Sequence, residues 1–232
     1  MYLNSAEYKE LKSMAAYMCS ITQEMAQAAL ESYINKDINK AQYIRERDKE
    51  LDNYSLKMDE LSGKIIALYW PRGSDMRYII STIKISSDFE RIGDHCKKIG
   101  KQIIKLQNSR FLFQMNSIYE LFEDVVDAVS SACAAYYSLD IDMAEKIIEN
   151  DNKIDILKSA AIKDIIKFMS GHNTETEDAA VTDLKTGINL INISRRLERM
   201  ADHAVNIAEA VYYIIKGTHK DKDLINEECS SN

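Results

Sequence analysis

Pairs of acidic side chains are the feature of this 232-residue sequence with the clearest capacity for chemistry. Four times an acidic residue is followed four positions later by aspartate, a spacing that places both carboxylates on one face of a helix. Like charges at this separation repel each other unless a cation neutralises them. The four pairs are Asp48/Asp52, Glu90/Asp94, Asp151/Asp155 and Glu198/Asp202.

Carboxylate pairs of this kind could bind metal ions. Oxygen ligands that converge on a solvent-facing patch suit hard or borderline cations such as magnesium, manganese, iron or calcium. The alternative is a solvated acidic face that pairs with lysine and arginine, and spacing alone leaves both open. A ferritin-type di-iron site is not expected, because it needs Glu-x-x-His pointing into a bundle core, whereas ERIGDH and ERMADH place histidine five residues after glutamate.

The positions of the pairs predict that they meet in space. A connector at 71–74 lies about 22 residues after Asp48/Asp52 and about 20 residues before Glu90/Asp94. At a rise of ~1.5 Å per residue, two antiparallel helices would bring both pairs to the same height, ~30 Å from the turn. We therefore expect four carboxylates on one surface patch, and the pairs at 151–155 and 198–202 predict a second such patch.

Other charged side chains accompany these pairs and could assist them. The arginines are expected to pair with and orient nearby carboxylates, while each histidine is either a hydrogen-bonded residue at the edge of the core or an accessory ligand. These four side chains are Arg91, His95, Arg199 and His203. A strip of lysines is either a solvated face or a surface for an acidic partner. It contains Lys97, Lys98, Lys101 and Lys105.

The elements that position these residues are predicted to be long helices. Gly and Pro together number eight, where average usage would give roughly 28. This shortage excludes sandwiches, barrels and glycine-loop nucleotide folds, which need many turns. Three apolar stripes have the spacing of a helix face. They are Leu51, Tyr54, Met58, Leu61, Ile65 and Leu68; Ile85, Phe89, Ile92, Cys96, Ile99, Ile103 and Leu106; and Ile193, Leu197, Met200, Ala204, Ile207, Val211 and Ile214.

An internal repeat divides the chain into two similar halves. Residues 75–99 match residues 183–207 at an offset of 108, with ten identities in 25 positions, and upstream the offset is 103. The fold class predicted is all-α, with two tandem pseudo-symmetric three-helix bundles, although a single six-helix bundle or a rod would show the same repeat. The expected helices are 5–34, 38–69, 75–108, 112–138, 141–169 and 178–216, and the expected domains are 1–109 and 110–217, followed by a polar tail at 218–232.

Composition narrows the class of function. The net charge of −7 argues against a nucleic-acid partner, which would require a basic surface. No signal pattern or long uncharged apolar run is present, so we expect a cytoplasmic protein that does not span a membrane. The cysteines are expected to be reduced, three of them in the core, and no nucleophile lies at a recognisable spacing from a base, so no catalytic residue is predicted.

The repeated ERxxDH string resembles the signature of the PhoU family of phosphate uptake regulators. It occurs in DFERIGDHCKKIGKQI at 88–103 and in RLERMADHAVNIAEAV at 196–211, and the tripeptides DMR at 75–77 and DLK at 183–185 also resemble the family. The resemblance covers 20–216 and implies a fold of two three-helix bundles. Two small departures accompany the resemblance. The second copy of the string has Ala201 where the first has Gly93, and the WPRGSD connector is unusual.

The resemblance implies a function for the protein and for its acidic pairs. Members regulate phosphate uptake with the high-affinity phosphate ABC transporter, through its ATPase, and with a membrane sensor histidine kinase, and they repress the phosphate-starvation response. Their acidic motifs bind multinuclear clusters of divalent or transition metals, iron or else magnesium, manganese or zinc. These motifs match all four pairs here. Family behaviour also implies a homodimer or a larger assembly.

Two alternatives to a metal-binding regulator stay open. One is a purely structural helical scaffold that binds no metal. The other is a metal-dependent phosphohydrolase that uses the same carboxylates, although an outward-facing patch cannot easily exclude water or orient a substrate.

Overall fold

The structure is a computed structural model that describes residues 5–106, 115–171 and 177–220. These residues form seven α-helices and no strand. The helices are α1 (Ala6–Asn35), α2 (Ile38–Tyr69), α3 (Ser74–Lys105), α4 (Asn116–Ser138), α5 (Ile141–Glu149), α6 (Asp151–Gly171) and α7 (Glu177–Lys216). The prediction of an all-α fold is therefore confirmed.

The fifth predicted helix, 141–169, is divided into two. Asn150 ends α5 with φ −85° and ψ 1°, and its carbonyl accepts a hydrogen bond from the amide of Lys153 at 3.0 Å. That bond spans three residues, so the α-helical pattern is interrupted for one turn before α6 begins. Asparagine has a low helix propensity because its side chain competes for backbone hydrogen bonds.

The helix ends agree with local sequence signals. Asp37 caps α2 by accepting hydrogen bonds from the amides of Asn39 and Lys40, and Asp140 caps α5 by accepting one from Met143. The connector between α2 and α3 turns sharply, because Trp70 has φ 48° and Gly73 has φ 57°. Glycine takes this left-handed conformation without strain, whereas a residue with a side chain does so less readily.

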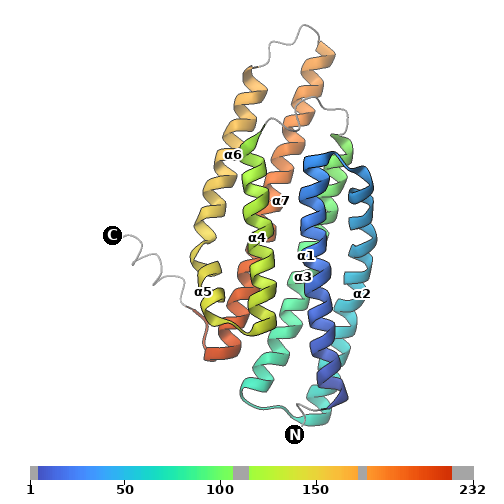
Figure 1. Cartoon of the computed structure of the whole chain (residues 1–232), viewed down its shortest axis with the longest axis vertical. Helices are drawn as coiled ribbons and strands as arrows, with labels where there is room; N and C mark the ends of the chain where they lie inside the picture. Colours follow the sequence, from blue (N-terminus) through green and yellow to red (C-terminus); the bar gives the residue numbers. More distant parts are fainter. Residues whose placement is uncertain (1–4, 107–114, 172–176, 221–232) are drawn as a thin grey trace, which may run out of the picture.

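The helices pack in two groups of neighbours (Figure 1). In one group α1, α2 and α3 contact each other, and in the other α4 and α7 pack with α5 and α6. The groups are joined chiefly by α3 against α7, with α1 against α4 beside them. The ends of α6 and α7 extend beyond α4 at the top of Figure 1. The expected boundary at 109–110 and most of the polar tail at 218–232 lie outside the described residues.

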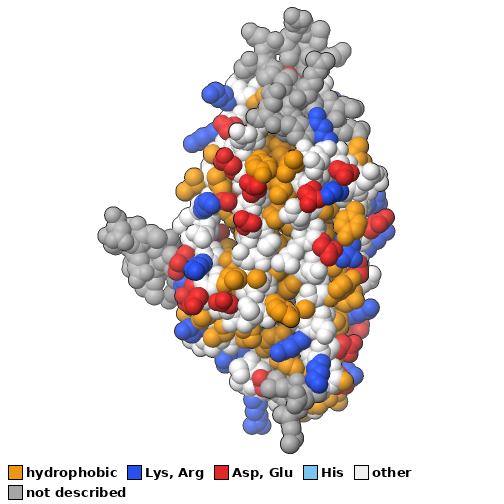
Figure 2. All heavy atoms as spheres, viewed as in Figure 1, with side chains coloured by type: hydrophobic (Ala, Val, Ile, Leu, Met, Phe, Trp, Pro, Cys, Tyr) orange, Lys and Arg blue, Asp and Glu red, His pale blue; other side chains and the backbone are white. Residues whose placement is uncertain are grey.

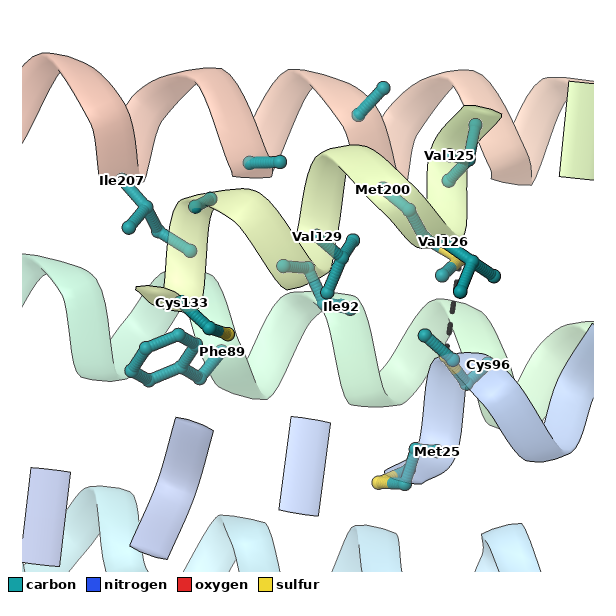
Figure 3. Packing of buried hydrophobic residues seen from close by; sticks show 14 of the residues in the cluster. Met25, Phe89, Ile92, Cys96, Val125, Val126, Val129, Cys133, Met200 and Ile207 are labelled. Carbon is teal, nitrogen blue, oxygen red and sulfur yellow. Dashed lines mark hydrogen bonds between the residues drawn. The ribbon is translucent and has the colours of Figure 1, made fainter. Parts of the chain in front are cut away.

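A single hydrophobic core runs through both groups. Met25 of α1, Phe89 and Ile92 of α3, Val129 of α4 and Met200 of α7 lie together in it, as Figure 3 shows. The cysteines of the described residues are free and buried, as expected: Cys19, Cys96 and Cys133. The stripes on α3 and α7 are buried along their whole length, but Leu68, the last residue of the predicted α2 stripe, is 56% exposed.

The surface has no simple charge pattern on the face presented in Figure 2. Acidic, basic and hydrophobic side chains are intermixed there over the helices that face the viewer. Within the described part of the chain, none of the helices combines the length and hydropathy needed to cross a bilayer.

Candidate metal centres

The first acidic cluster lies between α2 and α3 and comprises Asp48, Asp52, Glu90 and Asp94. Lys97 of α3 connects its two helices, because its ammonium lies 2.6 Å from Oδ2 of Asp48 and 3.1 Å from Oδ1 of Asp94. Lys98 pairs with the other oxygen of Asp94. The antiparallel packing of α2 and α3 thus brings the two acidic pairs to one depth.

Asp48 departs from the expected surface patch because it is 3% exposed. It lies where α2 packs against α3, and Lys97 lies beside its carboxylate. Its second oxygen, Oδ1, is shielded from solvent and has no hydrogen-bond partner among the residues that the structure describes. A buried carboxylate oxygen left unsatisfied in this way is energetically unfavourable, and a cation would relieve it.

The carboxyl groups of this cluster differ in the direction in which their surroundings shift their pKa values. Burial disfavours the charge of Asp94, but hydrogen bonds from Lys98 and Lys97 outweigh it and lower the pKa of that carboxyl. Burial and the neighbouring carboxylates raise the pKa of both Asp52 and Glu90, against the opposing charges of Lys97 and Arg91 respectively. Two of the four carboxylates are therefore under-compensated in the protein alone.

The close approach of α2 and α3 depends on Gly93. A Cβ atom at this position would lie 2.7 Å from Cδ2 of Leu51 and 3.3 Å from Cε of Met25. The α3 backbone therefore packs directly on the side chains below it, and the Asp48–Lys97 contact lies one turn further along α3.

The second acidic cluster lies between α6 and α7 and comprises Asp151, Asp155, Glu198 and Asp202. A lysine again connects the two helices: the ammonium of Lys158 is 2.7 Å from Oδ1 of Asp155 and 2.7 Å from Oε1 of Glu198. Burial and the charges of Glu198 and Asp151 raise the pKa of Asp202. Asp151 is half-buried and Asp202 is exposed, whereas their equivalents Asp48 and Asp94 are buried and half-buried, so this cluster is the more open of the two.

A cavity of about 330 Å³ adjoins the second cluster. It is lined by α4, α5, α6 and α7, with Asp151 and Asn150 at the helix break and Ala201 on α7. Ala201 occupies the repeat position of Gly93. The cavity also receives Asp124 and Asp127 from α4, so acidic groups from a third helix reach the vicinity of the cluster.

The accessory residues take different positions. Arg91 pairs with Glu90 at 3.5 Å, and Arg199 lies close enough to Asp202 to oppose the rise in its pKa. The histidines face each other across the α3–α7 interface with ring centroids 5.8 Å apart. His203 contacts Asp88 rather than an acidic pair.

The carboxylate oxygens of both clusters are ligands that suit a hard cation, but the side chains are not arranged to coordinate one. Among the described residues, no three Asp, Glu, His or Cys side chains are grouped closely enough to hold a metal ion as they stand. Lys97 and Lys158 lie where a cation would bind, so an ion would have to displace them. Sequence reasoning treated Lys97 only as part of a basic strip and did not single out Lys158, because long lysine side chains give no spacing signal for their partners.

Fold and site together define a class: all-α proteins with an internal repeat, in which each half carries an acidic cluster between two packed helices, α2 and α3 in the first half and α6 and α7 in the second. The PhoU domain profile matches residues 16–103 and 118–211, one segment in each half. The chain belongs to the PhoU family.

Relatives match nearly the whole chain. The phosphate-specific transport system accessory protein PhoU homolog of Zymomonas mobilis is 30% identical over 225 residues, covering 95% of this chain and 92% of the relative. Homolog 1 of Thermotoga maritima is 30% identical over 222 residues with the same coverage. The crystal structure of PhoU from Pseudomonas aeruginosa matches with a TM-score of 0.81 and 29% identity, over 94% of this chain and 100% of that one.

Proposed function

We propose that this protein is a non-catalytic accessory regulator of inorganic phosphate uptake that binds metal ions at its two acidic clusters. The observation that carries the regulatory role is the match to accessory proteins of phosphate-specific transport over 92% of their length. The first is 30% identical and aligns with 95% of this chain, so both acidic clusters fall within the shared region.

The metal-binding part of the proposal is supported by the clusters themselves. Asp48, Asp52, Glu90 and Asp94 would hold an ion in the first half, and Asp151, Asp155, Glu198 and Asp202 in the second. Carboxylate oxygens suit iron, magnesium or manganese, in single ions or multinuclear clusters. The unpartnered Oδ1 of Asp48 and the raised pKa values of Asp52 and Glu90 both favour a cation there.

We further propose that metal binding controls a surface read by partner proteins. An ion that displaces Lys97 would tie α2 to α3 through their carboxylates and free the lysine ammonium toward the surface. The partners proposed are the ATPase of the high-affinity phosphate ABC transporter and the membrane sensor histidine kinase, with repression of the phosphate-starvation response as the outcome. The protein is proposed to act as a homodimer.

The experiment is complementation of a bacterial strain that lacks its own PhoU, with a phosphate-starvation promoter driving a reporter. The wild-type chain is expected to restore repression in high phosphate and to copurify the ATPase and the kinase. A chain carrying E90A, D94A, E198A and D202A is expected to lose repression while remaining folded by circular dichroism.

A matched control distinguishes loss of the clusters from loss of negative charge elsewhere on the protein. Asp59 and Glu60 are exposed acidic residues of α2 outside both clusters, so D59A/E60A removes negative charge without touching either site. It should repress like the wild type. A wild-type chain that neither represses the reporter nor captures either partner would contradict the regulatory proposal and favour a structural scaffold.

A further inference from the structure

The interface between α3 and α7 places equivalent residues of the two halves opposite each other. At the repeat offset of 108, Asp88, His95 and Lys98 of α3 correspond to Arg196, His203 and Asn206 of α7. The imidazoles of the two histidines meet with ring centroids 5.8 Å apart. Arg196 therefore takes the position on α7 that Asp88 takes on α3, and its charge acts on His95.

On one side of this interface the polar groups satisfy each other. Oδ1 of Asp88 lies 2.9 Å from Nδ1 of His203, and it accepts a hydrogen bond of 3.2 Å from Nδ2 of Asn206. A single carboxylate thus serves as the acceptor for an imidazole and an amide of the other half.

On the other side of the interface, the residue equivalent to the acceptor Asp88 is the cationic Arg196. Arg196 replaces Asp88 and Lys98 replaces Asn206, so His95 faces two positive charges. The carboxylate of Asp94, one residue before His95, opposes these two charges.

Two polar atoms on this side have no acceptor. His95 is 9% exposed, and its Nδ1 has no hydrogen-bond partner within the described part of the chain. The same holds for Nε of Arg196, which is also shielded from solvent. Lys98 bonds to Asp94, but an ammonium has three hydrogens to donate. The imidazole of His95 and the guanidinium of Arg196 thus have donors without an acceptor, and the one carboxylate on this side, that of Asp94, pairs with Lys98.

We infer that a small tetrahedral oxyanion of the phosphate type binds between His95, Lys98 and Arg196 and supplies the missing acceptor. Arginine pairs with such anions through parallel hydrogen bonds, and an anion here would play the part that Asp88 plays on the other side. Lys101 and Lys105 follow Lys98 on the same face of α3 and are exposed, so they raise the positive potential near the site.

Lys98 adjoins the first acidic cluster through Asp94, but neither His95 nor Arg196 belongs to a carboxylate pair, so the site does not require a metal ion. It can therefore be tested on metal-free protein. Calorimetric titration of the full chain with inorganic phosphate, after treatment with a chelator, is expected to show one saturable site. R196A should weaken binding by about tenfold or more, because it removes a charge-assisted hydrogen bond from the complex.

The matched control is R195A. Arg195 is exposed and adjacent in sequence, so its loss removes the same charge from the surface and should change the affinity by less than about twofold. Titration with phosphoserine separates two sources of the same chemistry: binding of phosphate alone indicates the free ion, and comparable binding of both indicates a phosphoryl ester. Equal loss in both variants, or equal binding of chloride, would overturn the inference.

A second measurement needs no variant. In nitrogen-detected NMR of the histidine side chains, phosphate should shift the Nδ1 resonance of His95 and leave that of His203, which already contacts Asp88, nearly unchanged. Unperturbed His95 resonances at saturating phosphate would show that no anion binds there.

Discussion

The two acidic clusters share their sequence spacing but differ in how far they are open to solvent. In the first cluster Asp48 is 3% exposed and Asp94 is half-buried, whereas in the second their repeat equivalents are the half-buried Asp151 and the exposed Asp202, and a cavity of about 330 Å³ lies alongside. The repeat has kept the carboxylates in place while the packing around them has changed.

Two substitutions between the halves account for this difference. Arg47 continues α2 and pairs with Glu24 of α1 at 2.8 Å, while its repeat counterpart Asn150 ends α5 and lines the cavity. Gly93 allows α3 to pack directly on Leu51, while its counterpart Ala201 lines the cavity. A filled interface therefore closes the first cluster, and a broken helix opens the second.

The lysines show that the clusters obtain the same positive charge in different ways. Lys97 comes from the third helix of its half, and the residue at its repeat position is Val205. Lys158 comes from α6, and the residue at its repeat position is Ser55 of α2. What the halves share is therefore a lysine ammonium between the carboxylates rather than a lysine at one repeat position.

The largest contrast is expected from removing the lysines in metal-free protein. K97M should lower the free energy of unfolding by about 3 kcal/mol, because it leaves the buried carboxylate of Asp48 without its ion-pair partner. K158M should lower it by less than about 1 kcal/mol, because water can solvate Asp155. Urea denaturation of both variants measures the difference, and equal losses would refute the contrast in burial.

A smaller contrast is expected at Gly93 and Ala201. G93A should destabilise the protein by about 1–2 kcal/mol, although alanine is the better helix former, because its Cβ would clash with the buried side chain of Leu51. A201L should change stability by less than about 1 kcal/mol, since the added atoms can enter the cavity. Thermal unfolding tests this pair, and a tolerated G93A combined with a disruptive A201L would reverse the account.

The smallest contrast is between E90Q and E198Q, which should change the free energy of unfolding in opposite directions. The raised pKa of Glu90 means that its ionisation opposes folding, so E90Q should stabilise the metal-free protein by about 0.5 kcal/mol at pH 7. The gain should disappear as the pH falls below the ordinary pKa of glutamate, where both side chains are neutral. E198Q should instead destabilise slightly, because it weakens the bond to Lys158. The free energy of unfolding, measured against pH, tests this prediction. A change in the same direction for both variants would contradict it.

The sequence was sufficient for the fold and for the depth of the acidic pairs. Apolar periodicity located the buried stripes, and Asp37 and Asp140 marked helix starts that the structure confirms. The burial of Asp48 escaped prediction because it depends on how closely α3 approaches α2. The break at Asn150 escaped it because one asparagine within a periodic pattern is a weak signal.

Contacts between the halves could not be predicted at all. The approach of His203 to Asp88 joins residues 115 positions apart, and no local pattern encodes such a pairing. The lysine partners of the carboxylates were equally hidden, because a flexible four-carbon side chain can reach several helix positions.

Metal content tests the central proposal most directly. Elemental analysis should compare the wild-type protein purified from native expression with E90A/D94A, with E198A/D202A and with the control D59A/E60A. We expect each cluster variant to retain about half of the wild-type metal, since each keeps one of two similar oxygen-ligand sites, and the control to retain all of it. Full retention of metal in both cluster variants, or a wild-type protein without metal after growth in metal-supplemented medium, would contradict the proposal.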